Sequence, residues 1–240
     1  MALFLAFVLF VGFSLIGAEE EGVSKNVVAT VNGEKITSTE LTQQAQISQI
    51  YQVMLMSVGR QLPQFAQFLL GTEQGKDFLN EYKVFVLDSL IEEKIKMQNA
   101  KNMGIEVSEE AVQEQLQKIV DNNKGIKDMA DLESKLKENQ SSLSAFKKRI
   151  EDSLLRQNLK DEVTKDVSIS SEEAKKYYDE HKNEFKNQEG EVRPFEEAVG
   201  NVKAQLKSEK MNQQWQDWLS QTKEEADIEK YLSHIGIKRK

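Results

Sequence analysis

The sequence of 240 residues contains no cysteine. Disulfides, thiolate metal sites and cysteine nucleophiles are therefore excluded, and a lipoprotein anchor, which needs a cysteine at its cleavage point, is not expected. Proline and glycine are also scarce, with 2 and 12 residues, whereas Glu, Lys, Gln and Leu are abundant. This balance favours long helices over a β-sandwich or a β-barrel.

Acidic residues outnumber basic ones: the chain has 40 Asp and Glu against 32 Lys and Arg, which gives a net charge of −8. An acidic chain repels phosphate backbones, so nucleic acid is not expected as a partner. The one basic cluster, Lys238 to Lys240, is explained equally well as a solvated chain end. Hydrophobic residues make up 39% of the sequence, which is enough for a core, and the length suggests one large domain or two small lobes.

The sequence also lacks the motifs of common catalytic and cofactor sites. HExxH, P-loop, GxSxG and GxGxxG patterns are absent, and the two histidines, His181 and His234, lie in unrelated contexts. We expect His181 to complete a helix face near Tyr177 and Phe185. Carboxylates recur at helical spacing from lysines, which is typical of solvated helix faces. We therefore predict no catalytic residue, no metal site and no cofactor.

The first eighteen residues, Met1 to Ala18, carry no charged side chain and are followed at once by Glu19. As a helix this run reaches about 27 Å, close to a bilayer core of roughly 30 Å. Ile16-Gly17-Ala18 resembles a cleavage site, although no Lys or Arg precedes the apolar run. We expect a cleaved signal peptide or a retained membrane anchor, with a buried core helix as the remaining alternative. Either of the first two places residues 19–240 outside the cytoplasm, in the periplasm or cell envelope.

The pattern of predicted elements is a strand, six to eight helices and a strand. Val27 to Val31 is β-branched and precedes the turn signal Asn32-Gly33. Thr37 and Glu40 have the spacing of a capping box, so a helix is predicted from there to about Val58. Ile228 to Leu232 is predicted as the last strand. The fold class is therefore mostly α, with a small β pairing between the N-terminal and C-terminal strands.

The later helices follow from apolar stripes and local stop signals. Gly71 and Gly75 predict a loop, and the helix after it has two apolar stripes and ends at Gly104. The stripes comprise Leu79, Tyr82, Val86, Leu90 and Met97, and beside them Leu87, Ile91 and Ile95. Further helices are predicted after Ser108, around Met129–Leu136, over Leu143–Val163, from the capping box Ser170–Glu173 to Phe185, and over Phe195–Leu219.

Between Leu41 and Thr72 the one charged side chain is Arg60, in a chain with 30% charged residues. The segment is rich in Gln, Met and Phe, which indicates either a buried helical hairpin or a groove for apolar segments of other proteins. Trp215 and Trp218 are interpreted as core anchors. In the alternative interpretation they also contact a ligand. The predicted client-binding residues are Tyr51, Met54, Leu55, Met56, Leu62, Phe65, Phe68, Leu69, Trp215 and Trp218.

Several segments, in their order, resemble the SurA, PpiD and PrsA group of extracytoplasmic chaperones. They are VVATVNGEKITSTEL, VLDSLIEEKIKMQNAKNMGIEVSEEAV, SLSAFKKRIEDSLLRQNL, VSISSEEAKKYYDEHKNEF and RPFEEAVGNVKAQLKSEKMNQQWQDWLSQTKEEADIEKYL, and they cover nearly all of residues 26–233. The resemblance implies one SurA-like helical chaperone domain over residues 24–240. It also implies that unfolded chains bind this domain without nucleotide.

The sequence departs from the isomerase members of this group at one place. There, a parvulin domain of about ninety residues separates the two helices that correspond to those before Phe185 and after Arg193. Here only seven residues separate Phe185 from Arg193, so the resemblance predicts a chain without a parvulin domain.

Three functions remain open from the sequence. The favoured one is an ATP-independent chaperone (holdase) for unfolded secreted or outer-membrane proteins. The alternatives are a dedicated adaptor protein at the membrane and, less favoured, a peptidyl-prolyl isomerase. Client identity and oligomeric state are not predicted.

Overall fold

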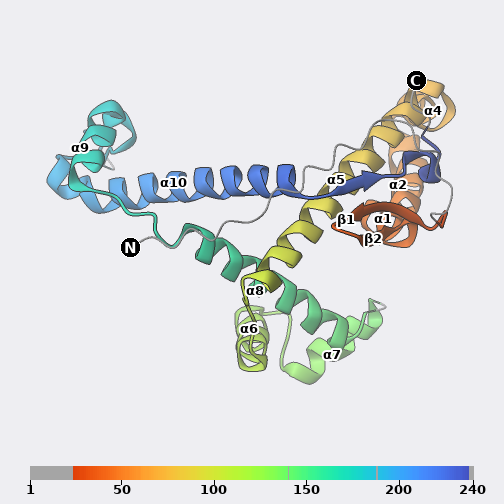
Figure 1. Ribbon diagram of the computed structural model, residues 1–240, viewed down its shortest axis with the longest axis horizontal. Helices are drawn as coiled ribbons and strands as arrows, with labels where there is room; N and C mark the ends of the chain where they lie inside the picture. Colours follow the sequence, from red (N-terminus) through yellow and green to blue (C-terminus); the bar gives the residue numbers. More distant parts are fainter. Residues whose placement is uncertain (1–23, 140, 188, 238–240) are drawn as a thin grey trace.

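The computed structural model describes residues 24–139, 141–187 and 189–237. The predicted signal peptide or anchor at residues 1–18 and the basic chain end lie outside the described residues. The described chain is mostly helical and forms three arms, each with its own apolar cluster (Figure 1). The arms meet where helices α5, α8 and α10 contact one another.

A three-stranded antiparallel sheet closes the first arm. Strands β1 (Val27–Val31) and β2 (Glu34–Thr37) form a hairpin, and β3 (Ile228–Lys230) pairs with the other edge of β1. The turn residues Asn32 and Gly33 have φ of 51° and 79°, as a two-residue hairpin turn with left-handed residues requires. The predicted pairing of the N-terminal and C-terminal strands is therefore confirmed.

The helix predicted from Thr37 to Val58 is interrupted. Helix α1 (Ser38–Ala45) begins with the predicted capping box, in which Thr37 Oγ1 accepts from the Glu40 backbone N–H and the Glu40 carboxylate accepts from that of Thr37. It ends at Gln46, whose φ of 48° is left-handed. The chain then continues as α2, a π-helix η1, α3 and α4, with bounds Ile47–Val53, Met54–Val58, Gly59–Gln61 and Pro63–Gly71.

Helix α5 (Glu73–Asn102) runs from α4 to the junction of the three arms (Figure 1). The predicted loop between Gly71 and Gly75 is wrong, because Thr72 alone separates α4 from α5 and caps α5 by accepting from the Gly75 N–H. A Cβ on Gly75 would lie 2.2 Å from the carbonyl oxygen of Leu69, so the glycine permits this tight crossing of α4 and α5.

The second arm contains α6 (Glu109–Asn122), α7 (Met129–Glu138) and α8 (Leu143–Thr164), in agreement with the predicted helices. Ser108 and Ser142 cap α6 and α8. The buried cluster of this arm consists of Val112, Leu116, Val120, Leu132 and Ile150.

The third arm contains α9 (Ser171–Glu180), the short 3-10 helix η2 (Lys182–Glu184) and α10 (Phe195–Glu225). A second 3-10 helix, η3 (Leu232–Ile235), follows β3 and packs against the first arm. The helix predicted to reach Phe185 ends at Glu180. Phe185 instead folds back into a buried cluster of Ala174, Tyr178, Phe185, Ala198 and Val202.

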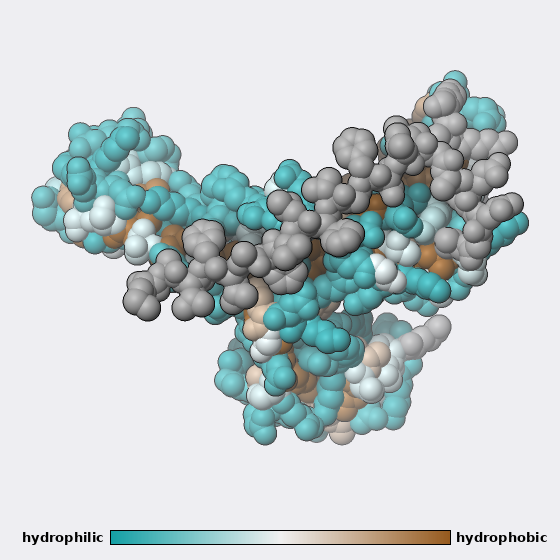
Figure 2. Space-filling model, viewed as in Figure 1, coloured by the Kyte–Doolittle hydropathy of each residue, from teal (hydrophilic) through white to brown (hydrophobic). Residues whose placement is uncertain are grey.

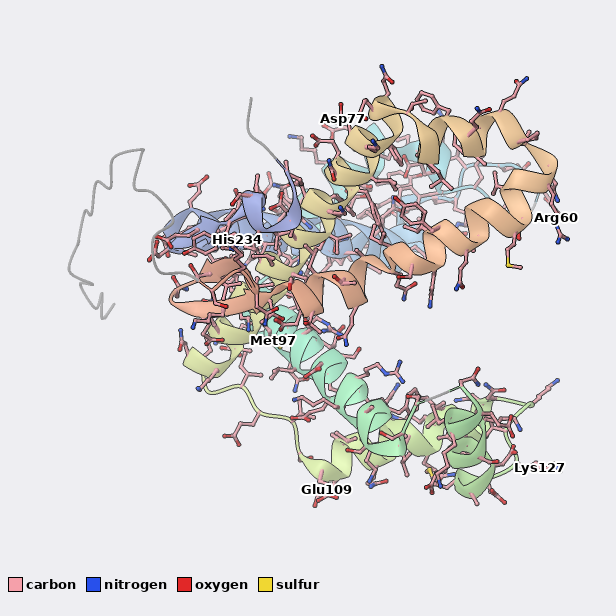
Figure 3. All side chains as sticks on the ribbon, turned by 90° about the vertical axis from the view of Figure 1, so that its right-hand side faces the viewer. Arg60, Asp77, Met97, Glu109, Lys127 and His234 are labelled. Carbon is pink, nitrogen blue, oxygen red and sulfur yellow. The ribbon has the colours of Figure 1, made fainter. Side chains whose placement is uncertain are left out.

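The second and third arms are joined to α5 of the first arm by ion pairs as well as by helix contacts. Arg156 of α8 lies 2.5 Å from Glu93, and Lys223 of α10 lies 3.0 Å from Glu92. In Figure 3 the first arm lies above the second, with Arg60 at the outer end of the first and Lys127 at the outer end of the second. Within the described residues, no helix combines the length and apolar character needed to cross a membrane.

Candidate functional site

The segment with almost no charge lies on the surface of the first arm. All eight of its glutamines are exposed: Gln43, Gln44, Gln46, Gln49, Gln52, Gln61, Gln64 and Gln67. Large apolar side chains are exposed among them, with Met56 at 66% and Leu62 at 60%. The buried-hairpin interpretation therefore does not hold for most of this segment.

We call the exposed large apolar side chains of α2 to α5 the apolar surface. Its members are Tyr51, Val53, Met56, Leu62, Phe65, Phe68, Phe78 and Phe85. Helix α4 contacts both α5 and the π-helix, so these elements form one packed unit that carries the apolar surface.

Helix α4 shows how one amphipathic pattern is divided between core and surface. Ala66 and Leu69 are 7% and 3% exposed and pack inward, whereas Phe65 and Phe68 are about half exposed. Leu69 was predicted to contact clients, but the structure places it in the core. The side chains of Met54 and Leu55 lie outside the described part, although their backbone forms the first residues of the π-helix. π-Helical turns are frequent at functional sites.

Sequence reasoning missed two aromatic residues of the apolar surface. Phe78 and Phe85 of α5 are 60% and 67% exposed. They are seven residues apart, so they lie on one face of the helix, and neither belongs to the two apolar stripes that predict its buried faces. A large aromatic residue outside both stripes was the signal that would have identified them.

The structure does not bring Trp215 and Trp218 to the apolar surface. Both lie on α10, half-buried, with their rings stacked at 4.9 Å between centroids. Trp218 borders an open pocket of about 590 Å³ between α10 and the segment Asp166–Ser168 that follows α8. Figure 1 shows α10 running from the junction toward the opposite end of the molecule from α4.

The two largest pKa displacements among the described residues lie on the third arm. Burial, followed by a 2.5 Å hydrogen bond to Glu209, raises the pKa of Tyr177 to about 12. A hydrogen bond from Lys210, followed by those from Ser170, lowers the pKa of Glu173 to about 2. His181, the residue that directly follows α9, stacks on Tyr177 at 4.1 Å between ring centroids.

The apolar surface offers recognition without acid–base chemistry. In the described chain, no group of three or more His, Asp or Glu side chains is placed to hold a metal ion. Apolar contact is non-directional, and Gln amides donate and accept hydrogen bonds without a net charge. Such a surface suits extended polypeptide of varied sequence.

Comparison with known protein families agrees with this architecture. Residues 1–160 match the family described as the SurA-like N-terminal domain, which is more than half of the chain. The chain belongs to this family. Residues 169–237 match a second family, the PPIC-type peptidyl-prolyl isomerase domain.

This second match overturns the prediction that the parvulin domain is lacking. That prediction sought the domain as an insertion between Phe185 and Arg193, whereas the match begins at residue 169 and includes the flanking segments themselves. In the structure, residues 169–237 comprise α9, η2, α10, β3 and η3. The spacing between two helices was therefore the wrong criterion for the presence of the domain.

Curated relatives carry the name foldase protein PrsA. One from Caldanaerobacter subterraneus subsp. tengcongensis is 38% identical over 191 residues, covering 77% of this chain and 53% of the relative. One from Clostridium botulinum is 29% identical over 178 residues, covering 73% of this chain and 51% of the relative. The chain thus spans about half the length of these relatives.

A solved structure supports the fold. It comes from a study of the virulence factor PEB4 and the periplasmic protein Cj1289, described as two structurally related SurA-like chaperones in Campylobacter jejuni. It aligns with a TM-score of 0.59 at 14% identity, covering 85% of this chain and 98% of that one. The predicted mostly helical, SurA-like fold is confirmed.

Proposed function

We propose that this chain is an extracytoplasmic chaperone or foldase that binds unfolded polypeptides on the apolar surface without nucleotide. The observation that carries the proposal is the exposure of eight large apolar side chains on α2 to α5, six of them between Leu41 and Thr72, where Arg60 is the one charged side chain. Relatives named as foldases support the same class of function.

Apolar area that is exposed to water is favourably buried when another chain covers it. Clustered apolar residues on a surface favour association, so they mark binding sites when polar residues surround them. Each exposed phenylalanine or methionine contributes on the order of 1 kcal/mol when a client covers it, which makes binding weak per contact and tolerant of sequence. The net charge of −8 keeps the loaded complex soluble.

The proposed clients are unfolded secreted or outer-membrane proteins. The apolar run Met1–Ala18 supports a location outside the cytoplasm, either through a cleaved signal or through a retained anchor. One of the proteins compared above is itself called periplasmic. A membrane-proximal adaptor with one dedicated partner is the competing function, and client range separates the two.

The test is light scattering of chemically denatured proteins diluted into buffer with and without the chain, in the absence of ATP. Suppressed aggregation of two unrelated clients at near-stoichiometric ratios supports the chaperone. Suppression of neither client would sink the general chaperone proposal and favour the dedicated adaptor.

The match of residues 169–237 to the PPIC-type domain favours a second candidate activity, peptidyl-prolyl isomerisation. The polar cluster on this segment includes Tyr177, His181, Gln205 and Glu209, with Gln205 Nε2 donating to the Tyr177 hydroxyl at 2.9 Å. Exchange between the cis and trans forms of a short proline peptide, measured by NMR with and without the chain, tests it. Acceleration that Tyr177→Phe reduces would place the activity at this cluster.

A further inference from the structure

A separate pocket lies on the second arm, between α6 and α8. Its volume is about 280 Å³, and its apolar lining comes from Ile119, Phe146, Ile150 and Leu154. Arg149 is the one charged side chain in the lining. Figure 2 shows apolar residues, in brown, on this arm among hydrophilic neighbours.

Arg149 is held at the rim of this pocket. Its guanidinium carbon lies 5.4 Å from the centroid of the Phe146 ring, and its Nη2 donates to Ser141 Oγ at 3.1 Å. The side chain is exposed, and within the described residues it forms no ion pair. Most N–H groups of a positioned guanidinium are therefore open to an incoming acceptor.

Acidic side chains on α6 and α8 close to the lining residues pair with lysines and not with Arg149. On α6, Glu114 lies 2.8 Å from Lys118. On α8, Lys148 lies 3.2 Å from Glu151 and 3.1 Å from Asp152. The rim of the pocket thus combines an unpaired positive charge with an apolar cavity, in a chain whose net charge is negative.

We propose that this pocket binds the C-terminal residue of a polypeptide, with a large apolar side chain in the cavity and the free α-carboxylate on Arg149. A guanidinium binds a carboxylate through charge-assisted hydrogen bonds. In a terminal residue the carboxylate and the side chain share one Cα, so both groups reach adjoining subsites without ordering further rotamers. This site does not use the apolar surface of α2 to α5, and it goes beyond the function proposed above.

The pocket has the size for one such side chain. A protein cavity of about 150 Å³ accepts benzene, so a space of about 280 Å³ takes a phenylalanine or leucine side chain and leaves room at its mouth. Ser and Gly at the last position would leave the apolar lining uncovered. Terminal phenylalanine, leucine and methionine are the residues that this pocket selects.

The experiment uses fluorescence anisotropy with the full chain and an N-terminally labelled peptide of about six Gly and Ser residues followed by phenylalanine. We expect the free acid to bind about 10- to 100-fold more tightly than the same peptide with a C-terminal amide, because the amide lacks the charge-assisted bond. Replacing the last residue by serine should weaken binding of the free acid about tenfold. Neither comparison requires a variant protein.

Arg149→Gln assigns the effect to this site. The variant should lose the preference for the acid over the amide, and the amide itself should bind it as it binds the unaltered chain. Arg60→Gln is the matched control, since Arg60 is also an exposed arginine but lies on the first arm, at the labelled tip in Figure 3. Equal binding of acid and amide, or a preference that survives Arg149→Gln, would overturn the proposal.

Dodecanoate tests the competing source of the same chemistry, because a fatty acid also joins a carboxylate to an apolar group. Binding of dodecanoate that depends on Arg149, together with absent binding of the peptide acid, would make this a fatty-acid site and overturn the proposal. Binding of the peptide acid that excess dodecanoate does not displace would support it.

Discussion

Phe78 and Phe85 allow client binding to be tested separately from core packing, because both lie on α5 but are exposed and outside its buried faces. We expect Phe78→Ser and Phe85→Ser each to weaken client binding about fivefold, while the free energy of unfolding changes by less than about 0.5 kcal/mol. Client binding is measured by aggregation suppression and stability by urea denaturation. Met103→Ser is the matched control, since Met103 is exposed at the far end of α5.

If client binding weakens and the free energy of unfolding also falls, Phe78 and Phe85 belong to the core instead.

The sequence predicted the segment of α4 that carries Phe65, Phe68 and Leu69 but did not separate surface from core within it. These three residues have the spacing of one apolar stripe, yet only Leu69 faces inward. The direction of a short helix depends on the elements that cover it, and local periodicity does not contain that information.

Gly75 is a residue whose cost of substitution follows from geometry alone. Alanine there would place its Cβ 2.2 Å from Leu69 O and 2.4 Å from Phe68 O, which are backbone atoms that move only with α4. We expect Gly75→Ala to destabilise the chain by about 2 kcal/mol, although alanine is the better helix former. Gly200→Ala in α10 is the control, because nothing lies within 4 Å of its added Cβ, and it should stabilise by about 0.5–1 kcal/mol. Urea denaturation measures both, and unchanged stability for Gly75→Ala would show that α4 is free to shift.

At the scale of elements, the capping box of α9 predicts a pH dependence. The pKa of Glu173 is lowered from an ordinary value of 4.5 to about 2, so the charged form stabilises the fold above pH 4.5 and this contribution is lost as pH falls toward 2. We expect Glu173→Gln to increase amide hydrogen exchange in the first turn of α9 at pH 6 and to change it little near pH 2. A difference that persists at pH 2 would contradict the role of the charge. Glu172→Gln is the control, since Glu172 lies beside it without this cap.

Local signals also decided which elements could be predicted. The capping boxes at Thr37 and Ser170 depend only on residues three positions apart, and helices α1 and α9 begin where predicted. The break at Gln46 had no such signal, because glutamine rarely adopts the left-handed conformation that ends α1. The end of α9 at Glu180 was missed for a related reason, since Phe185 leaves the helix to join a cluster with residues of α10.

At the scale of the whole molecule, the number of separate arms could not be read from the sequence, which suggested one large domain or two lobes. Each arm buries its own cluster, and the links between arms include half-buried ion pairs. Pairs at or near the surface contribute about 0.2–1 kcal/mol each. Ion pairs of this strength hold the arms only weakly in one relative orientation. The arms that present the apolar surface and the pocket at Arg149 are therefore expected to change their separation when ionic strength changes.

The absence of native cysteine makes this measurable, because Arg60→Cys and Lys127→Cys place one dye on each of two arms. In single-molecule energy transfer, raising salt from about 0.05 M to 1 M should broaden the distribution of dye separations, since screening shortens the Debye length to about 3 Å. Glu93→Gln, which removes the pair between α5 and Arg156, should broaden it at low salt and make it insensitive to further salt. Glu114→Gln removes a pair within α6 alone and should leave the distribution unchanged. A distribution that stays narrow in every case would mean that apolar packing at the junction fixes the two arms, so that a client spanning them would meet a rigid surface.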